Sequence, residues 1–119
     1  MKPEYKYEAH VLSIYDGDSM TVNVRLGMFQ VAEKQKLRLY GINTPEVRGP
    51  TAEEGKKVRD YVRDLIPVGS EIVIETFPDK RGDDRKGKYG RWLAIIWVGE
   101  MNLNEKLVEL GYAVEYLKD

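Results

Sequence analysis

Apolar and polar residues alternate along the first third of the chain in three runs separated by turn-forming residues. Over residues 5–15, β-branched and aromatic residues in rough alternation predict a strand. Asp16-Gly17-Asp18 then predicts a turn, because an Asp-Gly pair tolerates positive φ. A second strand is predicted where polar residues alternate with Met20, Val22, Val24 and Leu26, and Gly27 ends it. A third strand is predicted at about residues 31–40.

The next segment changes from a two-residue to a helical period. Thr51-Ala52-Glu53-Glu54 has the pattern of a capping box, in which the Thr51 hydroxyl accepts from the Glu54 amide and Glu54 reaches back. Pro67 and Gly69 end the helix that follows. Its apolar stripe consists of Val58, Tyr61, Val62, Leu65 and Ile66.

Two more strands and a short helix complete the chain. Residues 71–77 alternate as a fourth strand, and residues 92–98 are apolar enough for a fifth strand buried on both faces. A helix is predicted over residues 102–110 with Gly111 at its C-cap and with Leu103, Leu107 and Leu110 inward. This order predicts an α+β β-barrel with helices, an OB-fold: a five-stranded barrel with a helix between strands three and four and a C-terminal helix. The length predicts one domain over residues 1–119.

The composition excludes several kinds of chemistry. There is no cysteine and the only histidine is His10, which excludes disulfides and thiolate chemistry and argues strongly against a zinc site. A metal ion would therefore need oxygen ligands, which favours calcium or magnesium. Residues 1–6 lack the apolar core of a signal peptide and no stretch has the length of a membrane span, so we expect a cytoplasmic protein with no membrane partner.

The net charge of −1 does not by itself favour a nucleic-acid partner. Residues 79–91, however, carry six basic residues against three acidic ones. A mixed, glycine-containing segment of this kind is most often a solvated loop, and the alternative is a loop that faces phosphate groups.

Each candidate chemical residue has an ordinary structural explanation when taken alone. Asp16-Gly17-Asp18 is typical of a hairpin turn, Arg38 of a solvated strand residue, and Arg91 beside Trp92 of a cation–π pair. Their combination is more informative, because carboxylates that hold a cation, a further carboxylate that acts on water and two arginines together suit phosphodiester cleavage.

Four segments in this order and with this spacing resemble the staphylococcal nuclease (thermonuclease) family. The resemblance covers about residues 9–113. The segments are Tyr15-Asp16-Gly17-Asp18-Ser19, then Leu37-Arg38-Leu39 with Gly41-Ile42-Asn43-Thr44-Pro45-Glu46, then Tyr89-Gly90-Arg91 with Leu93-Ala94, and last Asn104-Glu105 with Leu107-Val108 and Gly111-Tyr112-Ala113.

The resemblance implies a calcium site, with magnesium or manganese as alternatives. Asp18 corresponds to the first carboxylate ligand, and Thr44 would contribute its backbone carbonyl. At Asn43 the family usually has an aspartate. Asparagine can ligate calcium through its amide oxygen but brings no charge, so metal affinity should fall. Asp16 would be an acid beside the ligands.

The resemblance also implies the residues that act on the phosphodiester. Glu46 corresponds to the carboxylate that activates or orients the attacking water. Arg38 and Arg91 correspond to the two arginines that bind the scissile phosphate and stabilise its developing charge. Lys88 and Tyr89 correspond to residues that contact a terminal phosphate. Gly87 is a second departure, because an acid is common there.

Two functions remain open from the sequence. The first is a monomeric metal-dependent nuclease that acts on DNA, RNA or both with little sequence preference and leaves 3′-phosphates. The second is an OB-fold module that binds nucleic acid or protein and has lost turnover. Asn43 favours the binding module, whereas Asp18, Arg38, Glu46 and Arg91 favour the enzyme, since the barrel needs none of these four.

Overall fold

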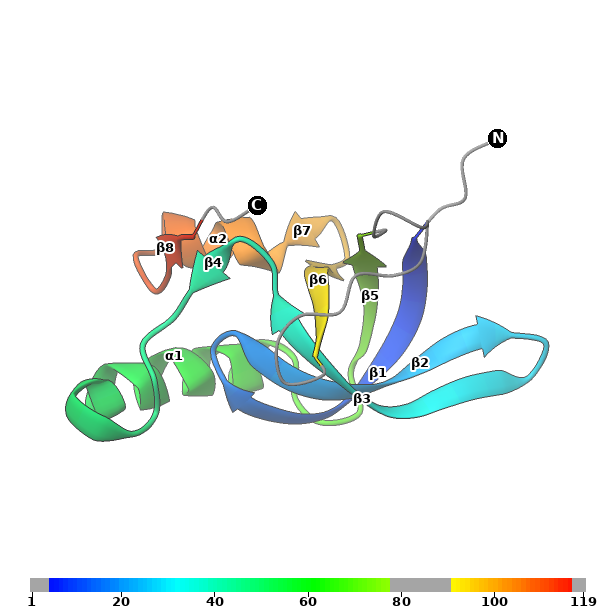
Figure 1. Cartoon of the computed structure of the whole chain (residues 1–119), viewed down its shortest axis with the longest axis horizontal. Helices are drawn as coiled ribbons and strands as arrows, with labels where there is room; N and C mark the ends of the chain where they lie inside the picture. The colour runs from blue at the N-terminus through cyan, green and yellow to red at the C-terminus, as the bar shows by residue number, and fades with distance from the viewer. Residues whose placement is uncertain (1–4, 78–90, 117–119) are drawn as a thin grey trace.

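Five long strands form a closed barrel in the computed structural model, which describes residues 5–77 and 91–116. Neighbouring strands pair antiparallel in the order β3-β2-β1-β5-β6, and a parallel pairing of β3 with β6 closes the barrel (Figure 1). The strands are β1 (Lys6–Asp16), β2 (Ser19–Gly27), β3 (Gln30–Leu39), β5 (Glu71–Thr76) and β6 (Trp92–Val98). Each predicted strand is confirmed to within a residue or two at its ends.

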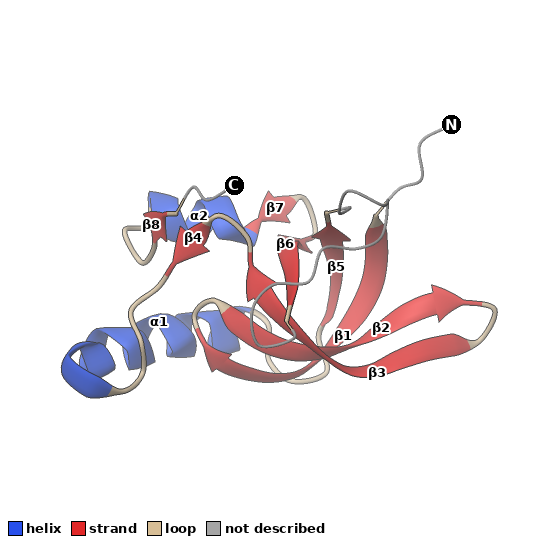
Figure 2. Cartoon of the chain, viewed as in Figure 1, coloured by secondary structure: helices blue, strands red, loops and turns tan. Residues whose placement is uncertain are grey.

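The helices lie where the apolar periodicity predicts them (Figure 2). A 3₁₀ turn, η1 (Gly49–Thr51), leads into α1 (Ala52–Leu65), which lies between β3 and β5 in the chain and packs against β1. The second helix, α2 (Leu103–Glu109), follows β6 and packs against it. Strand order and helix positions together confirm the OB-fold.

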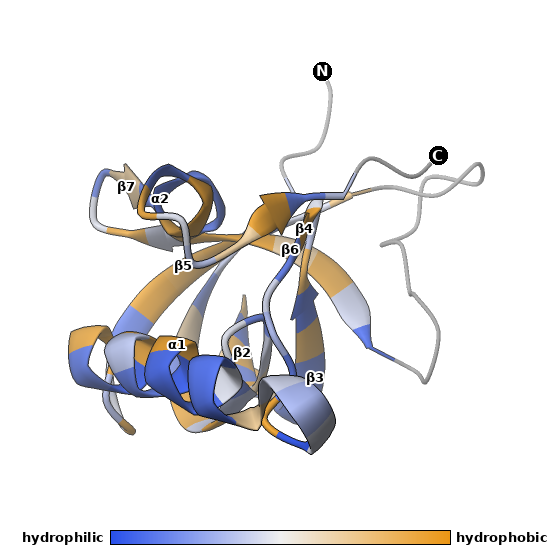
Figure 3. Ribbon diagram, turned by 90° about the vertical axis from the view of Figure 1, so that its left-hand side faces the viewer, coloured by the Kyte–Doolittle hydropathy of each residue, from blue (hydrophilic) through white to orange (hydrophobic). Residues whose placement is uncertain are grey.

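The core is built from the apolar residues that recur with a period of two in the strands and with the helical period in the helices. Inward positions of the strands and the apolar stripes of both helices join in one buried cluster, whose fully buried members include Val11, Val22, Leu37, Val62 and Ile96. In Figure 3, hydrophilic residues colour much of the outer side of α1, and hydrophobic residues colour parts of the strands behind it. The hydrophobic effect on these alternating positions holds the barrel closed.

The predicted capping box does not form. Thr51 is the N-cap residue of α1, but its side chain makes no cap hydrogen bond. Its hydroxyl donates instead to the backbone oxygen of Glu46, at 3.2 Å. The physical reason is that Thr51 is itself the last residue of η1, so the chain enters α1 already helical and the hydroxyl is directed at the preceding loop.

Two predictions of burial were also wrong. Only Ala94 and Ile96 of β6 are fully buried, because alternate residues of the strand face the outer side of the barrel, where covering is partial. Leu110 is 43% exposed, since α2 ends at Glu109 and Leu110 already belongs to the cap. The glycine cap itself is confirmed: Gly111 has φ +79° and its amide donates to Val108.

Three two-residue strands were not predicted. β4 (Ile42–Asn43) pairs antiparallel with β8 (Val114–Glu115), and β7 (Met101–Asn102) pairs antiparallel with the end of β6. The β4–β8 pair joins the segment after β3 to the C-terminal segment, and the Tyr116 amide donates to Gly41 at 2.7 Å. This small sheet is what holds Asn43 in place.

The charged segment at residues 79–91 lies almost wholly outside the described residues, and so do Lys88 and Tyr89. Both interpretations of that segment therefore stay predictions. No helix among the described residues is both long enough and apolar enough to span a bilayer.

Candidate active site

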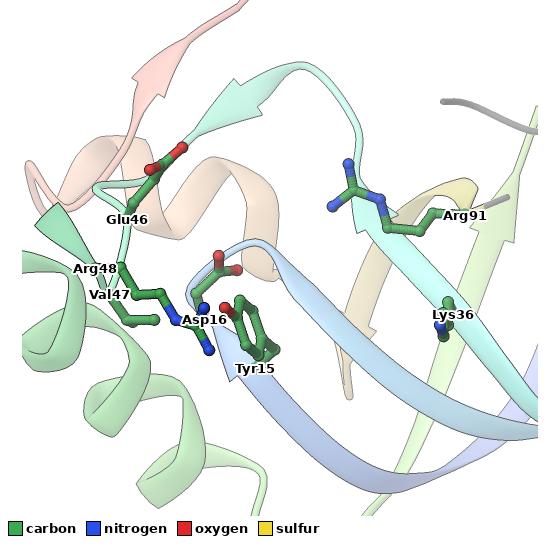
Figure 4. Close-up of a pocket in the computed structure, with 7 residues that line it drawn as sticks. All are labelled: Tyr15, Asp16, Lys36, Glu46, Val47, Arg48 and Arg91. Atoms are coloured by element: carbon green, nitrogen blue, oxygen red, sulfur yellow. The ribbon is translucent and has the colours of Figure 1, made fainter. Parts of the chain in front are cut away.

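An open cavity of about 390 Å³ lies beside the turn between β1 and β2. Figure 4 shows Arg91 and Lys36 on one side of it and Glu46 on the other, with the Arg91 guanidinium extending toward the cavity. Seven residues line it: Tyr15, Asp16, Lys36, Glu46, Val47, Arg48 and Arg91. The cavity thus brings together the end of β1, the strand β3, the loop after β4 and the residue that precedes β6.

A charged network adjoins this cavity. The Arg38 Nη1 atom lies 3.0 Å from Asp18 Oδ2, and both side chains are largely buried. Arg38 Nη2 donates to Asn43 Oδ1, and Nη1 also donates to the backbone oxygen of Leu39 at 2.9 Å. One guanidinium therefore contacts both side chains that the family resemblance assigns to the metal.

Strand pairing positions this network. Ser19 at the start of β2 lies opposite Arg38 near the end of β3, and the Leu39 amide donates to the Asp18 carbonyl at 2.9 Å. The Thr44 amide donates to Asp18 Oδ2 at 3.0 Å, which ties the loop after β4 to the same carboxylate. Asp18 is accordingly only 7% exposed.

Arg91 is joined to the network through one hydroxyl. Its Nη1 donates to Ser19 Oγ at 3.0 Å, and Ser19 in turn lies beside Asp18 with Oγ 3.5 Å from Oδ1. The two arginines therefore contact two adjacent residues where β2 begins: Arg38 contacts Asp18 and Arg91 contacts Ser19. A phosphate group between them would meet two guanidinium groups.

Close backbone contacts position Glu46, which is exposed on the loop before η1. A Cβ atom on Gly55 of α1 would lie 2.1 Å from the Glu46 carbonyl oxygen and 2.8 Å from the Val47 amide nitrogen. Only a glycine lets the helix approach this loop so closely. The Thr51 hydroxyl bond to Glu46 fixes the loop from the other end.

Gly17 has a similar function in the turn. It does not have a positive φ, so the expected reason for a glycine at this turn was wrong. Instead, a Cβ atom on Gly17 would lie 2.5 Å from Val58 Cγ1 and 3.0 Å from the Thr44 side chain. Gly17 thus allows the acidic turn to pack directly on α1 and on the Thr44 loop.

Asp16 has a perturbed acidity. Burial and the neighbouring Asp18 carboxyl raise the pKa of Asp16 to about 6, although its Oδ1 accepts the Asp18 amide at 3.2 Å. Asp16 therefore takes up a proton at a higher pH than an ordinary aspartate does.

The oxygen ligands of this region suit a hard cation, but their arrangement does not favour tight binding of one. Oxygens of Asp18, Asn43 and Thr44 are of the kind that calcium prefers. Thr44 Oγ1 is buried without a hydrogen-bond partner among the described residues. The same part of the chain holds no group of three or more carboxylate, histidine or cysteine side chains that could share one ion. Because Arg38 contacts both Asp18 and Asn43, a cation would have to compete with it.

Several residues of the site were not predicted. Lys36 and Arg48 line the cavity, Ser19 bonds Arg91, and Gly17 and Gly55 allow the close approaches. Gly55 carries a detectable signal, because an isolated glycine within a helical pattern usually has a packing reason. The other residues are ordinary in sequence, and only the fold brings them to the cavity.

The chain is similar to a known protein family. A family model described as Staphylococcal nuclease homologue matches residues 36–119, more than half of the chain. The chain belongs to the staphylococcal nuclease family. This family assignment makes it a nuclease-like domain, as the four sequence segments predicted.

Curated relatives agree with the family assignment. A thermonuclease of Staphylococcus hyicus is 32% identical over 106 residues, which are 87% of this chain and 56% of the relative. A thermonuclease of Staphylococcus intermedius is 27% identical over the same shares of the two chains. An uncharacterised protein of Methanocaldococcus jannaschii is 27% identical over 136 residues, 95% of this chain and 61% of the relative. The chain thus spans 56% to 61% of the length of these relatives.

Proposed function

We propose that this domain is a metal-dependent nuclease that hydrolyses phosphodiester bonds of DNA, RNA or both with little sequence preference and leaves 3′-phosphates. The observation that carries the proposal is the cavity between Glu46 and Arg91, with the Arg38–Asp18–Asn43 network beside it. The thermonuclease names of two relatives support the reaction class.

The arginines would stabilise charge that grows on the phosphoryl group. A guanidinium carries five N–H donors, so Arg38 keeps donors for a phosphate beyond those directed at Asp18, Asn43 and Leu39. Arg91 extends into the cavity from the other side. Both are held by protein contacts before substrate arrives, so little reorganisation is needed as the reaction proceeds.

Glu46 would act on the attacking water. Its carboxylate is exposed at the cavity, while its backbone is fixed by Gly55 and Thr51. A carboxylate oxygen of Glu46 takes a proton from the water as the water oxygen bonds to phosphorus. The bond from phosphorus to the 5′ oxygen then breaks, and that oxygen leaves with a proton taken up from solvent.

A divalent cation, when bound, would polarise a phosphoryl oxygen as a Lewis acid. Asp18 and Asn43 would hold it through side-chain oxygens and Thr44 through its backbone carbonyl. Calcium suits this donor set, and magnesium and manganese are alternatives.

A binding module without turnover is the second candidate. The observation that favours it is that Arg38 balances the Asp18 charge and also contacts Asn43. With asparagine in place of a second carboxylate, this network has no surplus negative charge to attract a cation.

The deciding experiment is hydrolysis of single-stranded DNA and RNA by the whole chain with calcium, magnesium or manganese, and with a chelator. We expect metal-dependent cleavage that is lost in Glu46→Gln. Glu53→Gln, at an exposed glutamate in the first turn of α1, is the matched control. A wild-type protein that stays inert with all three ions would overturn the nuclease proposal in favour of the binding module.

A further inference from the structure

The β2–β3 hairpin ends in an exposed apolar tip. Figure 1 shows this hairpin extending beyond the rest of the barrel. Met28 is 91% exposed, Phe29 is fully exposed, and Leu26 and Val31 beside them are about half exposed. These four residues, which we call the hairpin tip, form an apolar group at the far end of two paired strands, where the core cannot cover it.

The backbone of the hairpin tip is unfavourable for these side chains. Gly27 pairs with Gln30, so Met28 and Phe29 are the two central residues of the turn, and both have positive φ, +53° and +64°. Turns of this shape favour Asn-Gly, because bulky L-residues are strained in the left-handed region. Neither local conformation nor burial therefore explains Met28 and Phe29, which points to contact with a partner.

The charge of the hairpin indicates an anionic partner. Residues 19–39 contain four basic residues and one acidic residue, a net charge of +3 in a chain whose net charge is −1. Arg25 is partly engaged by Glu8 at 3.6 Å, with both side chains more than half exposed. Lys34 and Lys36 are exposed on β3.

The hairpin is also continuous with the cavity. Lys36 lines the cavity together with Arg91 and Glu46 (Figure 4), and β3 runs from there back to the hairpin tip. Lys36 and Arg38 lie on the same face of β3, opposite Thr21 and Ser19. Lys36 follows Phe29 by seven positions, which is about 23 Å of strand. Roughly seven stacked nucleotides span that length.

We propose that the hairpin tip is a second contact site for single-stranded nucleic acid, reached by the strand that leaves the cavity along β3. Phe29 and Met28 stack on bases or insert between them, and Lys34 and Lys36 contact phosphates on the way. Such contacts are insensitive to sequence, because every base has an aromatic face. The identity of the polymer rests on the proposed function. An anionic membrane would also suit an apolar tip with basic flanks, but it would not explain the continuity with the cavity.

The test uses the double variant Met28→Asn/Phe29→Gly. These residues suit the turn, so the variant should unfold at the same temperature as wild type or higher while lacking the apolar side chains. Val68→Asn is the matched control, because Val68 is 73% exposed on the loop after α1. Binding of oligothymidines of about 12 and about 4 nucleotides is measured by fluorescence anisotropy. A chelator is present so that metal-dependent turnover cannot occur.

We expect the double variant to lose affinity for the longer oligonucleotide on the order of tenfold and to bind the shorter one as wild type does. We expect Lys34→Gln to weaken binding of the longer oligonucleotide and to lower the salt dependence by about one ion. Equal affinities of wild type and double variant for the longer oligonucleotide would overturn the inference. Binding to phosphatidylserine vesicles that depends on the tip, with oligonucleotide binding unchanged, would assign the tip to a membrane and overturn it as well.

The outcomes separate this inference from the nuclease proposal. If binding depends on the hairpin tip but no metal ion supports cleavage, the hairpin site is supported and the nuclease proposal is ruled out. If the double variant cleaves long substrates with the wild-type KM, the nuclease proposal stands and the hairpin site is ruled out.

Discussion

The Arg38 guanidinium lies 3.0 Å from the Asp18 carboxylate and also donates to the Asn43 amide oxygen. One positive side chain thus contacts both side chains that the proposed metal site would use. This relationship gives Arg38 two opposing effects, since it would bind the phosphate and at the same time compete with the cation for Asp18.

The first prediction follows from this competition. Arg38→Met should tighten calcium binding on the order of tenfold, because it removes the positive charge that lies beside the Asp18 carboxylate. The same substitution should slow cleavage, because a phosphate ligand is lost. Isothermal titration calorimetry measures the affinity independently of activity. Arg25→Met, at an exposed arginine of the same hairpin, should leave calcium affinity unchanged. Weaker calcium binding in Arg38→Met would disprove the competition.

The second prediction concerns the uncharged residue of the site. Asn43→Asp should tighten calcium binding by roughly tenfold, since ligand charge is a main determinant of affinity in oxygen sites. Asn43→Ala should not, because it removes the oxygen without adding charge. Calorimetry and the calcium dependence of hydrolysis measure the two effects. If Asn43→Asp and wild type bind calcium equally, Asn43 is not a ligand.

The third prediction tests the proposed chemistry. Glu46→Ala and Arg38→Ala should each lower the cleavage rate by about 10²–10⁴, because each removes a group that acts in the transition state. Circular dichroism should show an intact barrel for both, since neither side chain belongs to the apolar core. If Glu46→Ala cleaves at a rate within a few-fold of wild type, Glu46 takes no part in the reaction.

The fourth prediction concerns the close approach of α1 to the Glu46 loop. Gly55→Ala should destabilise the fold by about 1–3 kcal/mol, because the new methyl group would lie 2.1 Å from the Glu46 carbonyl oxygen. Helix propensity alone predicts the opposite, a gain of roughly 1 kcal/mol. Urea denaturation distinguishes the two signs. Lys56→Ala, at the next and exposed position, is the control and should change stability little.

The fifth prediction uses the raised pKa of Asp16, which is about 6. The folded state holds this proton more tightly than the unfolded chain does, so the stabilisation is complete at low pH and is lost as pH rises through about 6. Asp16→Asn should therefore be more stable than wild type at pH 8, by about 1 kcal/mol after allowance for solvent screening of a half-buried group. The difference should vanish below pH 4.

Urea denaturation from about pH 3 to pH 8 in the presence of a chelator measures this effect. Asp64→Asn, at an exposed position of α1, should show no such pH dependence. An Asp16→Asn variant whose stability follows the wild-type pH profile would show that Asp16 does not titrate as stated.

The residue pattern alone predicts the five barrel strands, both helices and the family of this protein. Alternation with a period of two predicts four of the barrel strands, a continuous apolar run predicts the fifth, and the helical stripe predicts α1, because these patterns depend only on which faces of one element are buried. The order of the four motif segments predicted the staphylococcal nuclease family, which the family comparison confirms.

Which residues contact one another at the site depends on how the elements pack. The pairing of β2 with β3 and of β4 with β8 brings Asp18, Arg38 and Asn43 together, and no local pattern encodes that Arg38 contacts both of the others. The close approaches at Gly17 and Gly55 depend on how α1 packs, and the exposure of Phe29 depends on how far the hairpin extends beyond the barrel. Contacts between distant segments are set by packing of whole elements, so the residue pattern within one element predicts the element but not its neighbours.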